Sequence, residues 1–262
     1  MKFKRNLFLC ATRALMALLT LTLTCCSGQE PPARAGADGT AGRILVFSAT
    51  RGFRHASIAA GRDAFRSLGK ANGFGTDFSE DPEQFEPENL KRYKAVVFLN
   101  TTGSFFNAAQ KQAFQEFIRA GGGFVGVHSA ADTFYDWPWY GELVGGYFKS
   151  HPEIQPAALQ VIRKDHPATA HLPSPWERRD EWYNFKSLSP EIRVLITIDE
   201  KSYRGGENGD HHPVSWFHEF EGGRAFYTAL GHTRESYTEE PFLQHVLGGL
   251  KWVMRQETGT GK

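Results

Sequence analysis

Short apolar runs alternate with amphipathic segments through the first half of the chain. Runs at residues 44–48, 95–100 and 124–128 are apolar at nearly every position, as is typical of strands buried on both faces. Apolar residues recur at helical spacing after Ser57, which we interpret as a helix N-cap, and again after Asn107. Strands that alternate with helices predict a parallel sheet, because parallel neighbours need long crossover connections.

The second half of the chain predicts an antiparallel addition to this sheet. A short run at 76–78 supplies the remaining parallel strand, and further strand-like runs occupy residues 157–163, 194–199, 213–220 and 224–230. Glu-Gly-Gly between the last two runs predicts a hairpin, and a final helix is expected from about Pro241 to Met254. The fold class expected for residues 43–256 is α/β: a doubly wound, mostly parallel sheet with helices on both faces and an antiparallel elaboration.

The first 42 residues predict export and tethering rather than part of the fold. Residues 1–26 begin with basic side chains and continue through a short apolar stretch, which is typical of a secretory signal peptide. They end in Leu-Thr-Cys-Cys, which resembles a bacterial lipobox and makes Cys26 the expected lipidation site. Cys25 stands where Gly, Ala or Ser is usual, so acylation of Cys25 and ordinary secretion both stay open. Residues 27–42 predict a flexible tether, and we expect a lipid-anchored protein in the periplasm or at the cell surface.

The charge and cysteine content exclude several classes of function. The chain carries 30 Lys and Arg against 29 Asp and Glu, so no overall field favours nucleic acid or an anionic membrane. All three cysteines lie in the predicted leader, at positions 10, 25 and 26. The domain therefore offers no disulfide, no thiolate metal ligand and no cysteine nucleophile. Ala-Thr-Arg-Gly-Phe-Arg after the first strand, in place of G-x-G-x-x-G, disfavours a dinucleotide-dependent oxidoreductase.

Three histidines come just after apolar runs: His55, His128 and His232. In an open α/β sheet, ligands bind at the carboxyl ends of the strands, which meet at one edge. A single histidine in such a place is more often a hydrogen-bonded structural residue than a catalyst. Three histidines at the same edge favour a functional site, because histidines with separate structural roles would not be expected to gather at one edge of the sheet.

Other polar and aromatic residues are expected near this edge. Glu181 lies in Asp-Glu-Trp-Tyr, where desolvation by aromatic rings would raise its pKa towards a range useful for proton transfer. A solvated acidic pair at the start of a helix or strand explains the same spacing equally well. His212 is the better placed of two adjacent histidines before the predicted hairpin. Aromatic residues at 134–140 would suit stacking on sugar rings, or packing of a helix onto the core.

Five short motifs occur in order along residues 43–252. They are Phe-Arg-His at 53–55, Gly-Val-His-Ser-Ala-Ala-Asp at 126–132, Asp-Glu-Trp-Tyr at 180–183, His-His-Pro-Val-Ser-Trp at 211–216 and Leu-Gly-His at 230–232. Together they resemble the trehalose-utilisation ThuA-like family of the class I glutamine amidotransferase-like superfamily. The resemblance implies a flavodoxin-like fold. It also places His128 in the turn where amidotransferase relatives keep a cysteine, so thiolate-dependent amidotransferase chemistry is excluded.

The resemblance implies a role in the use of trehalose or other disaccharides, through routes that pass by 3-keto sugars. The expected substrate is a disaccharide or a 3-keto-glycoside, and the expected enzyme is a hydrolase, lyase or isomerase that transfers a proton next to a carbonyl. We assign His128 and His232 to the base and acid roles, and Glu181 to orientation or proton transfer. The expected substrate-binding residues are Arg54, His55, Asp132, Trp182 and His212.

Two alternatives to metal-free acid–base catalysis stay open. His55, His128 and His232, with Glu181, are acceptable ligands for a divalent ion such as Zn, Mn or Fe, although no compact spacing such as H-E-x-x-H is present. The other alternative is a non-catalytic sugar-binding lipoprotein, in which the histidines only bond hydroxyl groups. In each case the expected partner is a small carbohydrate, and binding of nucleic acid is not expected. Contact with the membrane is expected only through the lipid anchor.

Overall fold

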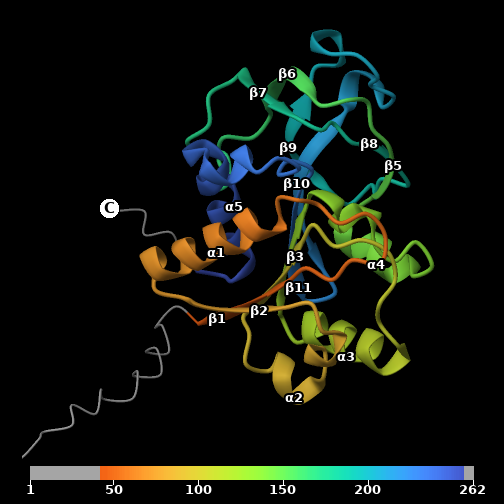
Figure 1. Ribbon diagram of the computed structural model, residues 1–262, viewed down its shortest axis with the longest axis vertical. Coiled ribbons are helices and arrows are strands. Elements are labelled where there is room, and N and C mark those ends of the chain that lie inside the picture. Colours follow the sequence, from red (N-terminus) through yellow and green to blue (C-terminus); the bar gives the residue numbers. More distant parts are fainter. Residues whose placement is uncertain (1–41, 257–262) are drawn as a thin grey trace, which may run out of the picture. The chain divides into compact units, whose positions relative to one another are not determined.

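The computed structural model describes residues 42–256, drawn in colour in Figure 1. The predicted leader with Cys26, and the predicted tether up to residue 41, lie outside these residues. The predicted domain at 43–256 falls wholly inside them. Among the described residues, no helix is long and apolar enough to cross a membrane.

Five parallel strands form one part of a nine-stranded sheet. Their order across the sheet is β2-β1-β3-β4-β11, which is the order of the flavodoxin-like doubly wound fold. The strands are β1 (Arg43–Phe47), β2 (Gly75–Ser79), β3 (Ala95–Leu99), β4 (Gly123–Val127) and β11 (Gly223–Thr228). β3 and β4 are buried at every position, in agreement with their continuous apolar runs. The predicted parallel sheet is confirmed.

Four antiparallel strands extend the sheet beyond β11. In order, they are β10 (Pro213–Phe220), β9 (Arg193–Ile198), β6 (Gln155–Val161) and β7 (Trp176–Asp180). The predicted hairpin of β10 and β11 is confirmed, with positive φ at Glu221 and Gly222 in its turn. Each of the four successive pairings is antiparallel, so β7 runs in the same direction as β11. A separate antiparallel pair is formed by β5 (Tyr147–Ser150) and β8 (Asn184–Lys186).

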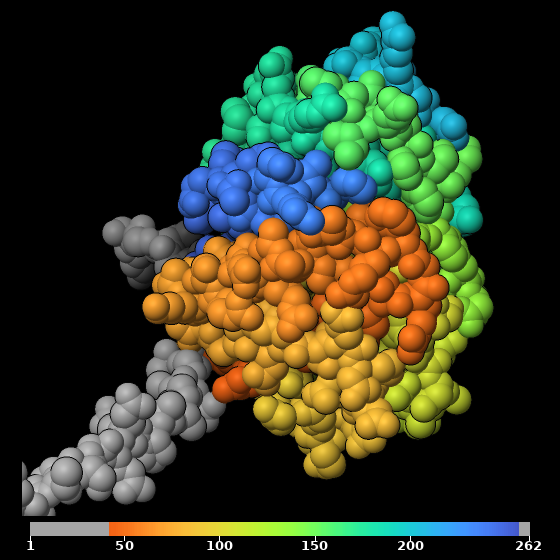
Figure 2. All heavy atoms as spheres, viewed as in Figure 1, coloured from red at the N-terminus to blue at the C-terminus, as the bar shows by residue number. Residues whose placement is uncertain are grey.

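Helices cover both faces of the sheet (Figure 1). On one face α1 (Ile58–Asn72) packs against α5 (Glu240–Val253), and the two form neighbouring parts of the surface in Figure 2. The other face carries α3 (Ala108–Arg119) and α4 (Pro138–Val144), with the single turn α2 (Pro87–Leu90) against α3. Short 3₁₀ helices occupy Pro82–Gln84, His128–Asp132, Glu200–Ser202, Gly209–His211 and Glu235–Thr238.

Phenylalanine rings fill the core between the sheet and α3. The Phe98 ring lies 5.5 Å from that of Phe114 and 5.4 Å from that of Phe124, measured between centroids. Phe47 lies 4.8 Å from Phe85 in an edge-to-face contact. All five rings are fully buried, and each contributes about 1.5–3 kcal/mol to the stability of the fold. This core gives the loops at the strand ends a rigid base.

The loops after β1, β3 and β11 meet at the carbonyl oxygen of Gly231. Ser57 Oγ donates to this oxygen at 3.4 Å, Asn100 Nδ2 at 3.3 Å and the Tyr237 hydroxyl at 3.1 Å. Gly231 has a φ of 105°, a conformation that strongly favours glycine. Helix α1 begins after Ser57 as predicted, and Ser57 is its N-cap residue, although the Ser57 side chain makes no capping hydrogen bond. The hydroxyl is used between loops instead, where it also accepts from Asn100 Nδ2 at 2.9 Å.

His245 is a buried histidine of α5 whose nitrogens are both bonded to the protein. Its Nδ1 donates to the Ala168 carbonyl at 2.8 Å, and its Nε2 faces the hydroxyls of Ser215 and Thr228 at 3.2 and 3.3 Å. Burial lowers the pKa of His245 from 6.5 to about 3, so the ring is neutral in the folded protein. Between these two values the unfolded chain binds a proton that the folded chain does not, and stability falls as the pH is lowered through this window.

We expect His245→Gln to remove this part of the pH dependence. Between about pH 6 and pH 4, the free energy of unfolding should fall by about 1.4 kcal/mol per pH unit more in the wild type than in the variant. Urea denaturation across this range measures the difference. His211→Gln, at an exposed position, is the control and should follow the wild type. Parallel pH profiles for the wild type and His245→Gln would contradict a neutral buried imidazole.

Candidate active site

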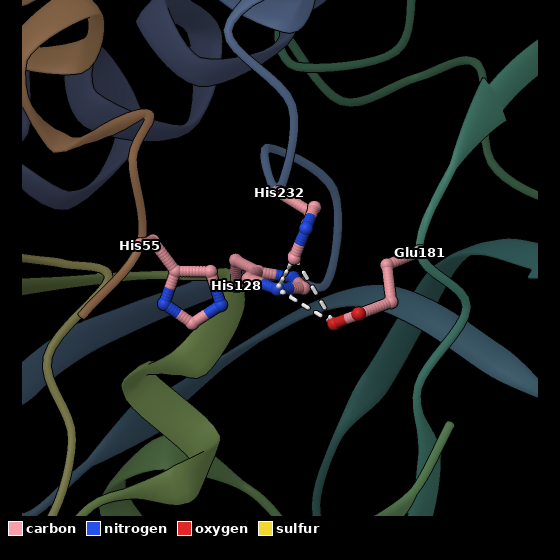
Figure 3. Close-up of side chains that lie close together, drawn as sticks. All are labelled: His55, His128, Glu181 and His232. Atoms are coloured by element: carbon pink, nitrogen blue, oxygen red, sulfur yellow. Dashed lines mark hydrogen bonds and ion pairs between the residues drawn. The ribbon is translucent and has the colours of Figure 1, made fainter. Parts of the chain in front are cut away.

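Three histidines and one glutamate converge at one edge of the sheet: His55, His128, His232 and Glu181 (Figure 3). Each offers one ligand-type atom, and these four atoms all lie within 4.8 Å of one another. His55, His128 and Glu181 are buried, and His232 is partly exposed. Among residues 42–256 no other group of three or more His, Asp or Glu side chains comes together in this way. We call these four residues the His–Glu cluster.

The directions of the strands explain this convergence. His55 lies in the loop after β1, His128 directly follows β4, and His232 lies in the loop after β11. Because β1, β4 and β11 are parallel, their carboxyl ends meet at the same edge. Glu181 directly follows β7, which the four antiparallel pairings return to the direction of β11. The antiparallel half therefore brings its carboxylate to the edge where the parallel half presents its histidines.

His128 is held at both its backbone and its ring. Its φ of 49° lies in the left-handed region, which is uncommon for a residue other than glycine. The Tyr227 hydroxyl donates to the His128 carbonyl at 2.7 Å, and the Tyr183 ring packs against the imidazole with centroids 4.2 Å apart. His128 Nδ1 donates to the Ala229 carbonyl at 2.7 Å. In the neutral ring Nε2 therefore keeps its lone pair, and this atom faces the cluster.

Three polar atoms of the cluster are in mutual contact. Glu181 Oε2 lies 3.1 Å from His232 Nδ1 and 3.3 Å from His128 Nε2, and the two nitrogens are 3.1 Å apart. The His55 ring stands edge-on to both, with centroids 4.8 Å from His128 and 5.0 Å from His232. Lone pairs and an anionic oxygen at these distances repel one another unless a positive charge lies between them. A shared proton or a metal ion supplies that charge.

The electrostatic environment keeps Glu181 ionised and His55 neutral. Burial opposes the charge on Glu181, but the contacts with His128 and His232, which donate to the carboxylate when their rings are protonated, outweigh burial and lower the pKa of the carboxyl group. The raised pKa predicted for Glu181 is therefore wrong. That prediction considered only the aromatic residues next to Glu181 in the sequence, whereas the histidines beside it in space lower its pKa. Burial, together with the charges of His128 and His232, lowers the pKa of His55 to about 2. Burial also opposes the charge on His232, but its contact with Glu181 outweighs burial and raises the pKa of His232.

The buried carboxylate of Asp180 joins the end of β7 to the loop that carries His232. Its oxygens accept hydrogen bonds from the backbone N–H groups of Gly231 at 2.9 Å, His232 at 3.2 Å and Glu181 at 3.0 Å. The buried guanidinium of Arg178 lies 3.3 Å from the same carboxylate. The negative charge of Asp180 is therefore both paired and hydrogen-bonded, as a buried charge must be. One side chain thus sets the backbone positions of two cluster residues.

Comparison with known proteins identifies the family. Residues 43–253 match the family described as ThuA, trehalose utilisation. The chain belongs to the ThuA family. Membership supports a carbohydrate-related role in trehalose utilisation, and it confirms the resemblance of the five sequence motifs. No match was found among curated proteins.

Solved structures of several bacterial proteins share the fold of this ThuA family member. A ThuA-like protein from Bacteroides uniformis is 23% identical with a TM-score of 0.71, and the match covers 87% of this chain and 97% of that one. A ThuA-like protein from Parabacteroides merdae is 19% identical with a TM-score of 0.70, covering 84% and 92%. A cytoplasmic protein from Salmonella typhimurium is 14% identical with a TM-score of 0.60, covering 80% and 99%. At these identities the similarity establishes the fold alone.

The structure brings together the four residues predicted for the centre of the site, but not two of the predicted substrate-binding residues. Arg54 forms an exposed ion pair with Glu80, with Nη2 and Oε1 2.8 Å apart. Trp182 is fully buried, and its indole N–H donates to the Gln155 carbonyl at 2.8 Å. Both are direct sequence neighbours of cluster residues, but these partners hold their side chains elsewhere.

The other two predicted substrate-binding residues lie behind or beside the cluster. His212 is fully buried, where its Nε2 donates to the Tyr183 carbonyl at 2.7 Å and its Nδ1 lies 2.8 Å from Glu200 Oε1. It therefore supports the residue that packs on His128 and offers no free atom to a ligand at the cluster. Asp132 ends the 3₁₀ turn that His128 begins, and burial raises the pKa of its carboxyl group.

His151 contacts the cluster although the sequence did not indicate it. Its Nδ1 lies 3.2 Å from Glu181 Oε1, the carboxylate oxygen opposite the one that faces His128 and His232, and its side chain is 42% exposed. His151 follows β5, a four-residue strand with a single buried position. Such a strand has no apolar run to mark it, so the strand-end argument that found the other histidines could not find this one.

We expect Asp180→Asn to weaken the fold at this edge. The amide cannot balance the charge of Arg178, and its NH₂ group opposes the backbone donors that the carboxylate accepts. The expected loss in the free energy of unfolding is about 3 kcal/mol, at the low end for a broken buried pair because Glu239 also lies 3.3 Å from Arg178. Urea denaturation measures this loss, with the exposed Asp165→Asn as a control that should stay near the wild type. Identical curves for Asp180→Asn and the wild type would show that this carboxylate does not support the edge.

Proposed function

We propose that the chain is an enzyme that acts on a 3-keto-glycoside, or on another disaccharide that carries a carbonyl, by proton transfer next to that carbonyl at a divalent metal ion held by the His–Glu cluster. The observation that carries this proposal is the meeting of four ligand-type atoms within 4.8 Å from four separate chain segments. Membership of the ThuA family supplies the carbohydrate class. His245 offers a contrast that supports a functional role, because its ring nitrogens face a carbonyl and two hydroxyls, whereas His128 Nε2 faces the other ligand-type atoms of the cluster.

The donor set fits a divalent transition-metal ion. Imidazole nitrogens and carboxylate oxygens are ligands that Zn, Mn and Fe accept. The hydrogen bond from His128 Nδ1 to the Ala229 carbonyl leaves Nε2 as the ligand atom, and such a bond is usual for metal-binding histidines. Ligation needs a neutral imidazole and an ionised carboxylate, which are the states that the surroundings of His55 and Glu181 favour.

The residues of the site suit proton transfer on a keto sugar. A bound ion would supply stabilisation of negative charge on the carbonyl oxygen. Glu181 turns Oε2 to the histidines and Oε1 towards His151, so Oε1 is placed to accept the proton from the carbon next to the carbonyl. That proton then returns to the neighbouring carbon in an isomerase, or leaves on the departing glycosidic oxygen in a lyase. His232, the most exposed histidine of the cluster, marks the side from which the sugar enters.

Metal content and turnover test this proposal together. We expect about one divalent ion per chain in the purified wild type by elemental mass spectrometry, and little or none in His128→Ala. Conversion of 3-keto-trehalose, followed by NMR, should fall at least about 100-fold in the same variant. His211→Ala removes an exposed histidine outside the cluster and should keep both the ion and the activity.

Other outcomes would replace parts of the proposal. A wild type that stays metal-free after purification without chelators and after reloading, yet converts the keto sugar, would leave acid–base catalysis by the same residues. A protein that binds the sugar and converts none of it would favour the non-catalytic sugar-binding alternative. Unchanged turnover in a folded His128→Ala variant would contradict the assignment of the His–Glu cluster as the active site.

We also propose that the protein is exported and anchored by a lipid on Cys26. The basic start, the apolar stretch and the Leu-Thr-Cys-Cys sequence of residues 1–26 support this. In a bacterial host, Cys26→Ser should move the protein out of the membrane fraction and remove the lipid mass from its N-terminus, whereas Cys10→Ser should change neither. Loss of the lipid in Cys25→Ser and not in Cys26→Ser would transfer the modification to Cys25.

A further inference from the structure

Phe53 is a large apolar side chain left in solvent beside the His–Glu cluster. Its exposure is 65%, and among the described residues only Tyr135 and Ile162 are comparable large hydrophobic residues on the surface. The Phe53 ring meets the ring of His55 edge to face, with centroids 4.9 Å apart and an interplanar angle of 84°. The exposed aromatic ring is therefore in direct contact with a member of the cluster.

The backbone around Phe53 is held in place, so its exposure does not come from a loose loop. The Thr102 hydroxyl donates to the Phe53 carbonyl at 3.0 Å, and Thr102 Oγ1 accepts from the Gly52 N–H at 3.1 Å. Arg51 N donates to the Thr102 carbonyl at 2.8 Å. Three successive residues are thus fastened to the loop after β3. An exposed aromatic ring on a fixed backbone is preorganised for ligand binding, because the protein loses little conformational freedom when the ligand binds.

Tyr135, the other exposed aromatic ring, is already engaged within the protein. Its hydroxyl donates to Asp132 Oδ1 at 2.7 Å, and the Phe148 carbonyl oxygen lies 3.1 Å from the same hydroxyl. The Lys186 ammonium lies 4.5 Å from its ring centroid. Phe53 is therefore the better placed of the two rings to receive a sugar.

The two sides of the cluster differ in character. Figure 3 shows His55 and Glu181 on opposite sides of His128. Phe53 adds an apolar ring on the His55 side, whereas His151 adds a half-exposed polar group on the Glu181 side. A pyranose has the same asymmetry, since its C–H groups form an apolar face and its hydroxyls point outward from the ring. Aromatic faces bind such apolar surfaces, and polar groups bind the hydroxyls.

We propose that Phe53 is the platform for the second sugar ring of a disaccharide, the ring that does not react at the cluster. Because His55 lies between Phe53 and the other cluster residues, a sugar stacked on Phe53 sits beside the centre and not over it. The reacting ring occupies the cluster, and the glycosidic bond crosses His55. This inference rests on the proposed function and adds to it a residue that selects disaccharides over monosaccharides.

Calorimetric titration with two probes, trehalose and glucose, tests the platform without relying on turnover. The purified wild type should bind trehalose more tightly than glucose. In Phe53→Ala the trehalose affinity should fall roughly tenfold while the glucose affinity stays within about a factor of two. Phe53→Trp should keep the preference for trehalose, and Ile162→Ala, which removes an exposed apolar residue elsewhere, should match the wild type.

Three results would overturn the platform. They are equal losses for trehalose and glucose in Phe53→Ala, an unchanged trehalose affinity in that variant, and a wild type that binds trehalose no more tightly than glucose. The metal and turnover measurements on His128→Ala separate this inference from the proposed function. If His128→Ala loses turnover but Phe53→Ala binds trehalose normally, the proposed role of Phe53 is wrong and the proposed function stands. If Phe53→Ala selectively loses trehalose binding but the wild type shows no turnover, the role of Phe53 as a platform stands. The protein is then a sugar-binding protein and not an enzyme.

Discussion

The buried carboxylate of Asp180 is the interaction on which the site depends. It accepts the backbone N–H groups of Gly231 and His232 from the loop after β11, and that of Glu181 at the end of its own strand. These segments belong to the parallel and the antiparallel halves of the sheet, and a buried carboxylate is costly unless such partners surround it. The relative position of Glu181 and His232 is therefore set by backbone hydrogen bonds to a third residue. Their own polar atoms remain available to an ion, a proton or a substrate.

The doubly wound sheet explains why imidazoles gather here. Its parallel strands bring whatever follows them to one edge, and the ThuA family member places histidines after β1, β4 and β11. The turn directly after β4 is one such position at the edge of the sheet. In this chain the same turn holds His128, whose ring and carbonyl are fixed by Ala229 and Tyr227. The fold thus holds the residue at this turn in a fixed position, and the identity of that residue decides which chemistry is possible there.

The sequence was sufficient for most of the parallel strands and for the three histidines of the cluster, because apolar runs mark buried strands and the ends of these strands locate the polar residues. Glu181 was found from its Asp-Glu-Trp-Tyr motif instead. The sequence was insufficient where buried positions are polar. β7 alternates between buried and exposed residues, yet two of its three buried positions are Arg178 and Asp180, so it does not read as a strand. Trp182 and Arg54 show the second limit. A residue next to a cluster member in sequence points elsewhere, and only the backbone geometry decides which side chain enters the site.

Ser57 and Asn100 reach the Gly231 carbonyl from 174 and 131 residues away along the chain. Contacts of this kind form late, because closing long stretches of chain costs entropy before the contacts compensate for it. A chain that ends before β11 contains His55, His128 and Glu181, but it lacks both His232 and the carbonyl to which the loop of His55 is fastened. The centre is therefore assembled only when the last parallel strand joins the sheet. An ion held by all four residues, as proposed, would therefore bind only after β11 has joined the sheet.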